Sequence, residues 1–262
     1  MFSAPVYLHG LIAAAALAAL AWPLSVYLRN VAIVDSLWSL MILLQALVFA
    51  IGAADASLHG LSPRGILVLA LVAVWALRLS GYITWRNWGH GEDRRYQAIR
   101  ARNEPHFAMK SLYLVFLLQA VLAWIIAMPV LGAILGQSAL ALADFAGITL
   151  WVVGFLFEVG GDWQLARFKA DPANRGKVMD RGFWAYTRHP NYFGDCCQWW
   201  GLYLIAVSAG AWWSIAGPLV MSVLLIRVSG VRLLEKDISD RRLKYPDYIR
   251  RTNAFFPGMP RK

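Results

Sequence analysis

The chain has 262 residues, of which 59% are hydrophobic and only 15% are charged, and it carries a formal net charge of +10. Soluble domains are roughly 25% charged, so this composition excludes an ordinary soluble protein and indicates a polytopic membrane protein. No long polar block is present that could form a second, soluble domain. In a membrane protein, an excess of Lys and Arg in cytoplasmic loops explains the positive charge more simply than nucleic-acid binding, so we expect no nucleic-acid partner.

Seven apolar segments are each long enough, or nearly long enough, to cross about 30 Å of hydrocarbon. They cover approximately residues 6–28, 31–53, 64–86, 109–135, 140–163, 193–209 and 211–236. We therefore predict an all-α integral membrane protein with seven transmembrane helices, built as a single domain over residues 1–262. No internal repeat or long linker argues for a further division.

The basic residues are distributed unevenly between the predicted loops. Of the 25 Lys and Arg residues, all but Arg64 and Arg78 fall in the first hairpin, in loops 86–110 and 164–192, or in the tail from Arg227 onward. The positive-inside rule assigns this side to the cytoplasm, with the N-terminus outside and the C-terminus inside. We expect a multi-pass membrane location, the inner membrane if the source is bacterial, and a cap of cytoplasmic loops over the helices.

A dense polar motif, Thr187–Asp195, stands at the mouth of the sixth apolar segment. If a helix starts at the proline of this motif, Asn191 and Asp195 share a face, and their amide and carboxylate can bind a carboxamide or a ribose. Arg188 can bind phosphate through paired hydrogen bonds, whereas His189 could merely cap a turn. We interpret the motif as holding one end of a charged cofactor at the membrane surface.

Two ionisable residues lie in the second and third apolar segments, where charge is expensive and usually faces the protein interior. Asp35 is early in its segment, and Arg78 is in the middle of the next one. Either residue has a structural alternative, because Asp35 could cap a helix at the interface and Arg78 could extend towards phosphate headgroups.

Two acids, Glu158 and Asp162, are four residues apart in the fifth segment and therefore share one helix face. Because like charges repel, we expect a cation or a bound hydrogen-bond donor between them. A structural alternative is an ion pair with Arg86 or Arg188 that holds the helices together.

Several familiar cofactor motifs are missing from the sequence. It contains no Gly-x-Gly-x-x-Gly after a strand, no Walker loop and no His-Glu-x-x-His, and its His and Cys residues lack metal spacing. Cys196 and Cys197 are adjacent, so we expect two buried small residues rather than a disulfide. We predict no metal site, and a nucleotide cofactor would be held by helix ends and loops.

The motif Arg188-His189-Pro190-Asn191-Tyr192-Phe193-Gly194-Asp195, followed by Trp199-Trp200-Gly201, resembles the steroid 5α-reductase superfamily, and within it the bacterial, DUF1295-like branch. The resemblance covers roughly residues 30–257. The further motifs that agree are Glu158-x-x-x-Asp162, Gly-Glu-Asp-Arg-Arg-Tyr at 91–96, Ser229-Gly230-x-Arg232-x-x-Glu235 and Tyr248-x(8)-Pro257. Arg-His-Pro-x-Tyr alone also recurs in sterol reductases and in isoprenylcysteine carboxyl methyltransferases, which use S-adenosylmethionine.

The resemblance implies a seven-helix membrane enzyme of the 3-oxo-5α-steroid 4-dehydrogenase type, which uses NADPH to reduce the activated C=C bond of a Δ4-3-oxosteroid. In this reading, helices in 1–53 carry the substrate-side acid, and 108–262 form a steroid-reductase-like core. The implied catalytic residues are Asp35, Arg78 and Tyr82. The implied cofactor-binding residues are Arg86, Asn87, Glu92, Asp93, Arg95, Tyr96, Glu158, Asp162, Lys169, Arg188, His189, Asn191, Tyr192, Asp195, Arg232, Glu235, Tyr245 and Tyr248. The implied substrate-binding residues are Val34, Asp35, Trp38 and Trp75.

Two of these positions depart from the resembled family. Vertebrate members have Gln where this chain has Val34, and Tyr where it has Trp75. The usual partners of the substrate carbonyl are therefore changed, although a protonated Asp35 could still stabilise the enolate.

We expect a monomer that takes a lipophilic, steroid-like substrate from the bilayer and contacts membrane lipids. The sequence leaves two alternatives open, which are an S-adenosylmethionine-dependent methyltransferase on the same scaffold and a non-catalytic lipid-binding or transport protein.

Overall fold

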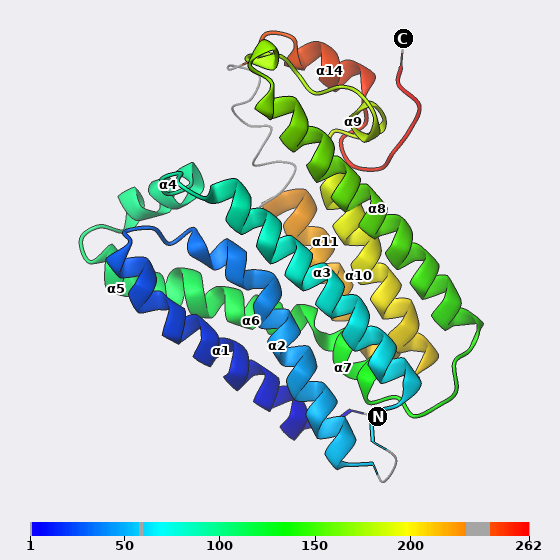
Figure 1. Cartoon of the computed structure of the whole chain (residues 1–262). Coiled ribbons are helices and arrows are strands. Elements are labelled where there is room, and N and C mark those ends of the chain that lie inside the picture. Colours follow the sequence, from blue (N-terminus) through cyan, green and yellow to red (C-terminus); the bar gives the residue numbers. More distant parts are fainter. Residues whose placement is uncertain (1, 58–59, 229–241, 262) are drawn as a thin grey trace. The chain divides into compact units, whose positions relative to one another are not determined.

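The computed structural model describes residues 2–57, 60–228 and 242–261 (Figure 1). Within these ranges the chain is helical, and Thr187 and Asn253 form an isolated bridge. The elements are α1 (Ala4–Tyr27), α2 (Ile33–Asp55), α3 (Pro63–Asn87), α4 (Arg94–Asn103), α5 (Phe107–Ser111), η1 (Leu112–Leu117), α6 (Leu118–Ile126), α7 (Met128–Ile134), α8 (Leu142–Ala170), η2 (Pro172–Asn174), α9 (Phe183–Tyr186), α10 (Pro190–Ser208), η3 (Trp212–Ile215), α11 (Ala216–Val223), η4 (Leu224–Val228) and α14 (Tyr245–Arg251). Arg232 and Glu235, two predicted cofactor ligands, lie outside the described residues.

Five helical segments are long and apolar enough to cross a membrane, which confirms the coarse prediction of an all-helical, multi-pass membrane protein. They are Ala4–Tyr27, Ile33–Asp55, Pro63–Asn87, Phe107–Ile126 and Leu142–Ala170. The last two predicted spans correspond to α10, which has 19 residues, and to the shorter apolar stretch Trp212–Val228. Neither meets the same criteria, so the count of seven spans and the orientation stay predictions.

The fourth predicted span is shorter than the sequence indicates. Its helical segment ends at Ile126, and a separate helix, α7, begins at Met128. Pro129 lies in the first turn of α7, where its missing N–H and fixed φ suit a helix start and disfavour continuation of the preceding helix. Residues 109–135 therefore contain one span and a short helix.

The chain divides into two compact units, which we describe separately. Unit 1 consists of Met1–Ala141 and Ala206–Gly217, and unit 2 consists of Leu142–Ile205 and Pro218–Lys262. The prediction of a single functional domain over the whole chain stays a prediction.

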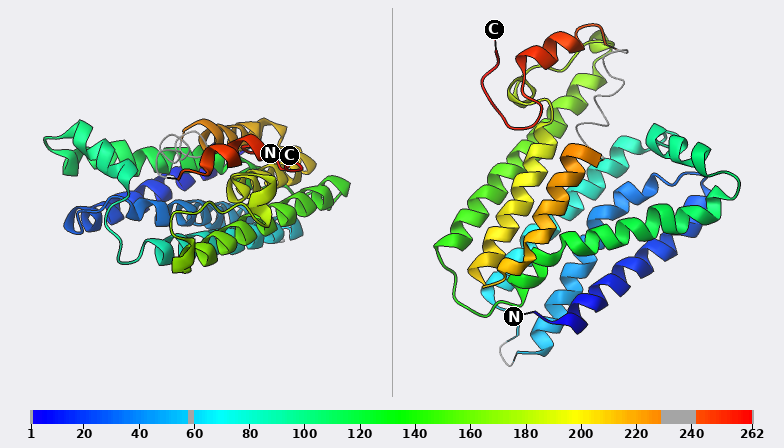
Figure 2. Two further views of the ribbon diagram at one scale, coloured as in Figure 1. Left: turned by 90° about the horizontal axis from the view of Figure 1, so that it is seen from above. Right: turned by 180° about the vertical axis from the view of Figure 1, so that it is seen from behind.

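In unit 1 the long helices α1, α2 and α3 run alongside one another, and α6 packs against α1 and α2 (Figures 1 and 2). The core side chains, such as Phe49 of α2 and Phe116 of η1, are fully buried. α1 and α6 are joined by Tyr7 and Trp124, whose rings stack with centroids 4.2 Å apart. Each side chain also donates a hydrogen bond to the other residue's carbonyl oxygen, so these polar tips are satisfied within an apolar interface.

A buried arginine fastens the loop that follows α7 to the start of α3. Arg64 is only 1% exposed, and its guanidinium donates to the carbonyl oxygens of Ser138 and Ala139 at 2.9 and 2.8 Å and to the hydroxyl of Ser138. A rigid fork of donors matches several acceptors at once, which a lysine cannot do. Arg64, expected near the side that lacks basic residues, therefore has a structural role.

In unit 2 the helices α8 and α10 lie side by side and approach through glycines (Figures 1 and 2). A Cβ placed on Gly154 would lie 2.4 Å from the carbonyl oxygen of Gly194, and one placed on Gly194 would lie 2.3 Å from that of Gly154. Gly147 and Gly201 make a second reciprocal contact of this kind. A Cβ placed on either residue would lie 2.6 Å from the carbonyl oxygen of the other. Small residues at such positions let two helix backbones touch directly.

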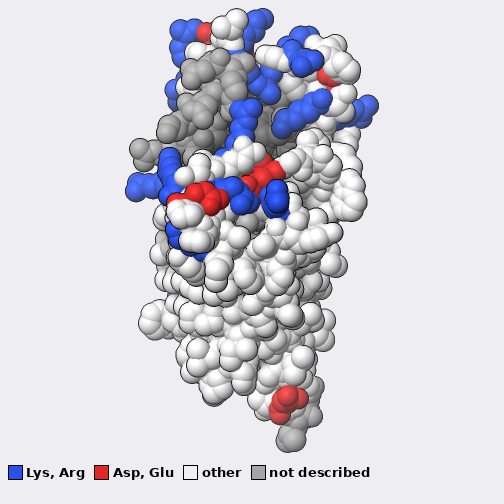
Figure 3. Space-filling model, turned by 90° about the vertical axis from the view of Figure 1, so that its left-hand side faces the viewer, with Lys and Arg blue, Asp and Glu red and all other residues white. Residues whose placement is uncertain are grey.

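The face in Figure 3 shows where charge gathers on the molecule. Figure 3 shows a broad area of this face without Lys, Arg, Asp or Glu, with charged side chains of both signs on one side of it and an acidic group at the opposite end. A wide uncharged area of this kind is typical of a surface that contacts lipid tails.

Gly154→Ala should lower the free energy of unfolding by about 1–3 kcal/mol, because the added methyl group meets a backbone oxygen that cannot rotate away. The measurement is thermal or denaturant unfolding of the purified protein in detergent. Gly81→Ala is the matched control, since a Cβ at this helical glycine of α3 has no atom within 4 Å. It should be neutral or stabilising by up to about 1 kcal/mol. Equal stability of both variants would contradict the close α8–α10 approach.

Arg64→Lys should also destabilise the protein, by about 2 kcal/mol. The single ammonium group of lysine cannot replace both guanidinium donors, so buried carbonyl oxygens of the 138–139 loop lose their partners. The same substitution at Arg94, an exposed arginine of α4, should change the unfolding free energy by less than about 0.5 kcal/mol. If the two substitutions have the same effect, Arg64 does not fasten the loop.

Candidate functional site

A cluster of polar side chains in unit 1 joins the start of α2 to α4 and α6. Asp35, in the first turn of α2, accepts a hydrogen bond from Arg95 Nη2 at 2.8 Å and another from the Tyr96 hydroxyl at 2.5 Å. Gln119 of α6 donates from Nε2 to the same tyrosine oxygen at 3.0 Å. We call Asp35, Arg95, Tyr96 and Gln119 the Asp35 cluster.

Two acids hold the segment before α4 in place. Asp93 caps α4 by accepting from the backbone N–H of Arg95 at 2.8 Å, and it also accepts from the Arg95 side chain at 3.0 Å. Glu92 accepts from the backbone N–H of Val31 at 2.9 Å and is paired with both Nε and Nη2 of Arg100. These bonds tie the α4 region to the start of α2, and they direct Arg95 and Tyr96 towards Asp35.

The electrostatic surroundings keep the Tyr96 phenol protonated. Burial, reinforced by the charge of Asp35 and by the hydrogen bond to it, raises the pKa of Tyr96 far above its ordinary value. Burial alone would raise the pKa values of Glu92 and Asp93. Hydrogen bonds from Arg100 and Val31 nevertheless lower the pKa of Glu92 below its ordinary value, and hydrogen bonds from Arg95 do the same for Asp93. The cluster therefore offers a permanent O–H donor beside ionised acids.

The hydrogen bonds of Asp35 bear on its expected role as a protonated donor. Each of its oxygens accepts a hydrogen bond, one from the Arg95 guanidinium and one from Tyr96. A carboxylate is the form that accepts two such bonds, particularly next to a guanidinium. In this arrangement Tyr96 supplies the hydroxyl and Asp35 accepts from it, and the role of Asp35 as a donor stays a prediction.

Three other predicted residues lie in a row on α3. The Tyr82 ring lies between two guanidinium groups, with Arg78 Cζ 5.3 Å and Arg86 Cζ 5.8 Å from its centroid. Arg86 also donates to the side-chain oxygen of Asn87 and contributes to the lowered pKa of Asp93. This arrangement brings Arg86 within electrostatic reach of the α4 region.

The predicted substrate-binding residues differ in their accessibility. Val34 and Trp75 are buried, with exposed fractions of 0% and 2%, and so belong to the helix packing. Trp38 is half-buried, one turn beyond Asp35 on α2. Of the three apolar positions, Trp38 is therefore the one that a ligand can reach without repacking the core.

A second polar cluster lies between α8 and α10 of unit 2. Asp162 accepts a hydrogen bond from Asn191 Nδ2 at 3.0 Å, and Glu158 accepts one from Gln198 Nε2 at 2.7 Å. Both acids face α10, as their i,i+4 spacing predicts, and both are almost fully buried. Their partners in these bonds are amides, which are hydrogen-bond donors, and the expectation of a cation or a bound donor between the two acids stays a prediction. We call these four residues the Asp162 cluster.

The first part of the polar motif contacts the C-terminal tail. Arg188 Nη1 donates to the carbonyl oxygen of Thr252 at 2.5 Å, and its backbone N–H donates to the carbonyl oxygen of Asn253 at 2.9 Å. The Tyr248 hydroxyl of α14 donates to the carbonyl oxygen of Trp184 at 2.5 Å. Arg188 and Tyr248, predicted as cofactor ligands, therefore hold the tail against the motif.

The other residues predicted from the motif divide by burial. His189, Asp195 and Tyr245 are buried, whereas Asn191 and Tyr192 are half-buried, and the rings of His189 and Tyr192 stack with centroids 5.7 Å apart. Lys169 is exposed in the last turn of α8. Among the motif residues, Asn191, Tyr192 and Phe193 are half-buried, and the first two carry polar groups that a ligand can meet.

Two amides, Gln119 and Gln198, were not predicted as functional residues. Each lies within an apolar helix and donates a hydrogen bond to a member of a cluster. The available signal was the occurrence of an amide in an otherwise apolar segment, where such side chains usually bond to another helix.

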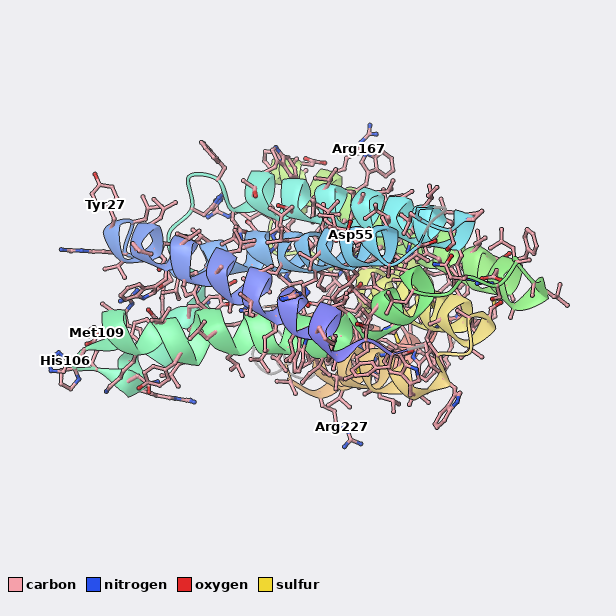
Figure 4. All side chains as sticks on the ribbon, turned by 90° about the horizontal axis from the view of Figure 1, so that it is seen from below. Tyr27, Asp55, His106, Met109, Arg167 and Arg227 are labelled. Atoms are coloured by element: carbon pink, nitrogen blue, oxygen red, sulfur yellow. The ribbon has the colours of Figure 1, made fainter. Side chains whose placement is uncertain are left out.

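Unit 2 presents cationic and amide side chains of the kind that the predicted dinucleotide cofactor requires. Five of its exposed cations come from the end of α8 and the segment that follows, namely Arg167, Lys169, Arg175, Lys177 and Arg181 (Arg167 is labelled in Figure 4). Cations suit phosphate groups, and the half-buried amide of Asn191 suits a carboxamide or a ribose. These residue types fit a dinucleotide. Among the described residues, no group of three or more His, Cys, Asp and Glu is placed to hold a metal ion.

Comparisons with known proteins give the family of the chain. An uncharacterized protein of Schizosaccharomyces pombe is 23% identical over 290 residues, which cover 97% of this chain and 80% of that protein. No solved structure matches the chain. The family described as a protein of unknown function, DUF1295, matches residues 21–252. The chain, a helical protein with five apolar segments of membrane-spanning length, therefore belongs to the DUF1295 family.

Proposed function

We propose that this protein is a membrane oxidoreductase that uses NADPH to reduce the C=C bond of a lipophilic enone, with Δ4-3-oxosteroids as the substrate class. The DUF1295 family is associated with steroid reductase-like proteins, which supports this reaction class. The observation that carries the proposal is the Asp35 cluster, in which a buried phenol with a raised pKa is held next to a membrane-spanning helix.

The chemistry of enone reduction accounts for such a phenol. Bound NADPH would supply the hydride, and its addition to the β carbon leaves negative charge on the substrate's carbonyl oxygen. A hydrogen-bond donor aimed at that oxygen stabilises the developing enolate. The raised pKa makes Tyr96 a donor that keeps its own proton, and a solvent proton then completes the reaction at the α carbon.

The neighbours of Tyr96 have separate roles in this proposal. Asp35 retains its bond to Arg95 when the Tyr96 hydroxyl rotates towards a substrate oxygen, so the half-buried carboxylate is not left unpaired. Gln119 approaches the tyrosine oxygen from α6 and fixes its position. Because the cation of Arg95 lies beside Asp35, the cluster does not repel an enolate as a lone carboxylate would.

We assign cofactor binding to the residues of unit 2 that a ligand can reach. Asn191 would bind the carboxamide or ribose, and the exposed cations at the end of α8, including Lys169, would bind phosphate. We also propose that α10 and the segment from 211 to 236 cross the membrane, which gives seven spans. The basic loops then lie in the cytoplasm, where NADPH is available.

NADPH should raise the unfolding temperature of the purified protein, and Asn191→Ala should weaken NADPH binding about tenfold, the effect of losing one net hydrogen bond. Binding is measured by titrating the cofactor during thermal unfolding, with the unfolding temperature of each apo variant as a check on folding. Gln137→Ala removes an exposed amide from the loop after α7 and should leave binding unchanged.

The same titration separates the alternatives. Stabilisation by S-adenosylmethionine with none by NADPH would replace the reductase proposal by a methyltransferase. If neither compound stabilises the protein, a non-catalytic lipid-binding or transport role becomes the better explanation.

Tyr96→Phe should lower kcat for Δ4-3-oxosteroid reduction about 10²–10³-fold, because it removes the donor to the developing enolate and keeps the ring. The readout is steroid-dependent oxidation of NADPH, followed at saturating cofactor. NADPH affinity should stay the same, since the substitution leaves the cofactor-binding residues of unit 2 intact.

Tyr113→Phe is the matched control, because this tyrosine of η1 is 56% exposed and should be catalytically silent. Wild-type turnover by Tyr96→Phe would remove the phenol from the mechanism.

A further inference from the structure

Unit 1 contains a cavity of about 220 Å³ where α1 ends, walled by α1, the start of α2, α4 and α5. Its polar lining includes the guanidinium groups of Arg29 and Arg100 and the hydroxyls of Ser25 and Ser111. The hydroxyl protons already bond to carbonyl oxygens, Ser25 to Trp22 at 2.7 Å and Ser111 to Ala108 at 2.6 Å. The arginines are therefore the groups that can donate to a ligand.

Arg29 occupies a backbone position that usually belongs to glycine. Its N–H donates to Val26 and that of Asn30 donates to Ser25, which is the hydrogen-bond pattern of a Schellman motif at the end of α1. The φ of Arg29 is 49°, in the left-handed region where a side chain is strained. Strained non-glycine residues tend to occur where the side chain has a function.

The charged side chains that line the cavity are those of Arg29 and Arg100. The guanidinium of Arg29 makes no hydrogen bond or ion pair among the residues that the structure describes. Arg100 is paired with Glu92 through two bonds, at 2.9 and 2.8 Å, so these two groups are neutral together. Arg100 is also held in place over the Phe107 ring, with its Cζ 4.6 Å from the centroid. Arg29 therefore supplies the cation with which an anionic ligand group can pair.

Exposed apolar side chains flank the cavity. Tyr27 and Leu28, next to Arg29, are 84% and 50% exposed, and Met109 of α5 is 70% exposed. The labelled Tyr27 and Met109 lie at the same end of this unit (Figure 4). At the end of a membrane-spanning helix, such residues contact acyl chains close to the headgroups.

We propose that this cavity binds the phosphodiester of a glycerophospholipid, with Arg29 as its principal ligand. A phosphodiester carries one negative charge, which the guanidinium of Arg29 can pair with. The volume is below the roughly 300–1,000 Å³ of sites for drug-sized ligands, so a headgroup fits and a dinucleotide does not. The acyl chains extend along the exposed apolar side chains beside the cavity. This site is separate from the proposed reductase chemistry, and neither depends on the other.

The experiment compares lipid binding by the whole protein and two variants. Detergent-purified protein is titrated with short-chain phosphatidylglycerol, a phosphodiester with one net negative charge, and binding is followed by native mass spectrometry. Arg29→Gly removes the guanidinium and also relieves the backbone strain, so it should fold at least as stably as the wild type while its apparent Kd rises about tenfold or more. Arg102→Gly, at an exposed arginine in the last turn of α4, removes an arginine that does not line the cavity, and it should leave the Kd unchanged.

A second arm uses inorganic phosphate to identify the source of the anion. Phosphate alone should neither bind at millimolar concentration nor raise the unfolding temperature, because it lacks acyl chains. Competition by phosphate at the affinity of the lipid would identify a soluble anion as the ligand and overturn the lipid proposal. An unchanged lipid Kd in Arg29→Gly, or an equal loss in Arg102→Gly, would show that the cavity does not recognise the phosphodiester.

Discussion

The requirement that every polar group in an apolar bundle find a partner determines how both clusters are built. Asp35 is next to membrane-spanning residues, and its two oxygens are satisfied by Arg95 and Tyr96 from a segment sixty residues away in sequence. Glu158 and Asp162 are satisfied by amides of α10. Because an unpartnered charge in such surroundings is expensive, each pairing also fixes the position of the helix or loop that supplies the donor.

Close packing makes the second of these pairings possible. Amide side chains are short, so Asn191 and Gln198 reach the acids of α8 only when the two backbones nearly touch. The reciprocal contact of Gly154 and Gly194 supplies that approach within one turn of Glu158. The glycines and the acids therefore act together. A larger residue at either glycine would push α8 and α10 apart, and the amide of Gln198 would then be too far from Glu158 to donate a hydrogen bond.

The sequence predicts the parts of this arrangement that depend on local periodicity. Apolar length identifies the five long helices, and i,i+4 spacing places Glu158 and Asp162 on one face. Hydrogen bonds between segments that are far apart in the sequence produce no such periodic pattern. Nothing local to Arg188 indicates that its guanidinium binds the carbonyl oxygen of Thr252, sixty-four residues later. Gln119 was missed for the same reason, because a single amide carries no spacing.

The charge balance around Asp35 bears on how the proposed donor can work. Arg95 lies between two carboxylates, those of Asp35 and Asp93, and so neutralises only one of them. Arg86 supplies the second positive charge, since its field lowers the pKa of Asp93. An enolate forming beside Tyr96 would then meet no excess negative charge, even though the carboxylates of Asp35 and Asp93 lie nearby. A single phenol with a raised pKa suffices as the donor because two arginines compensate the acids that hold it in place.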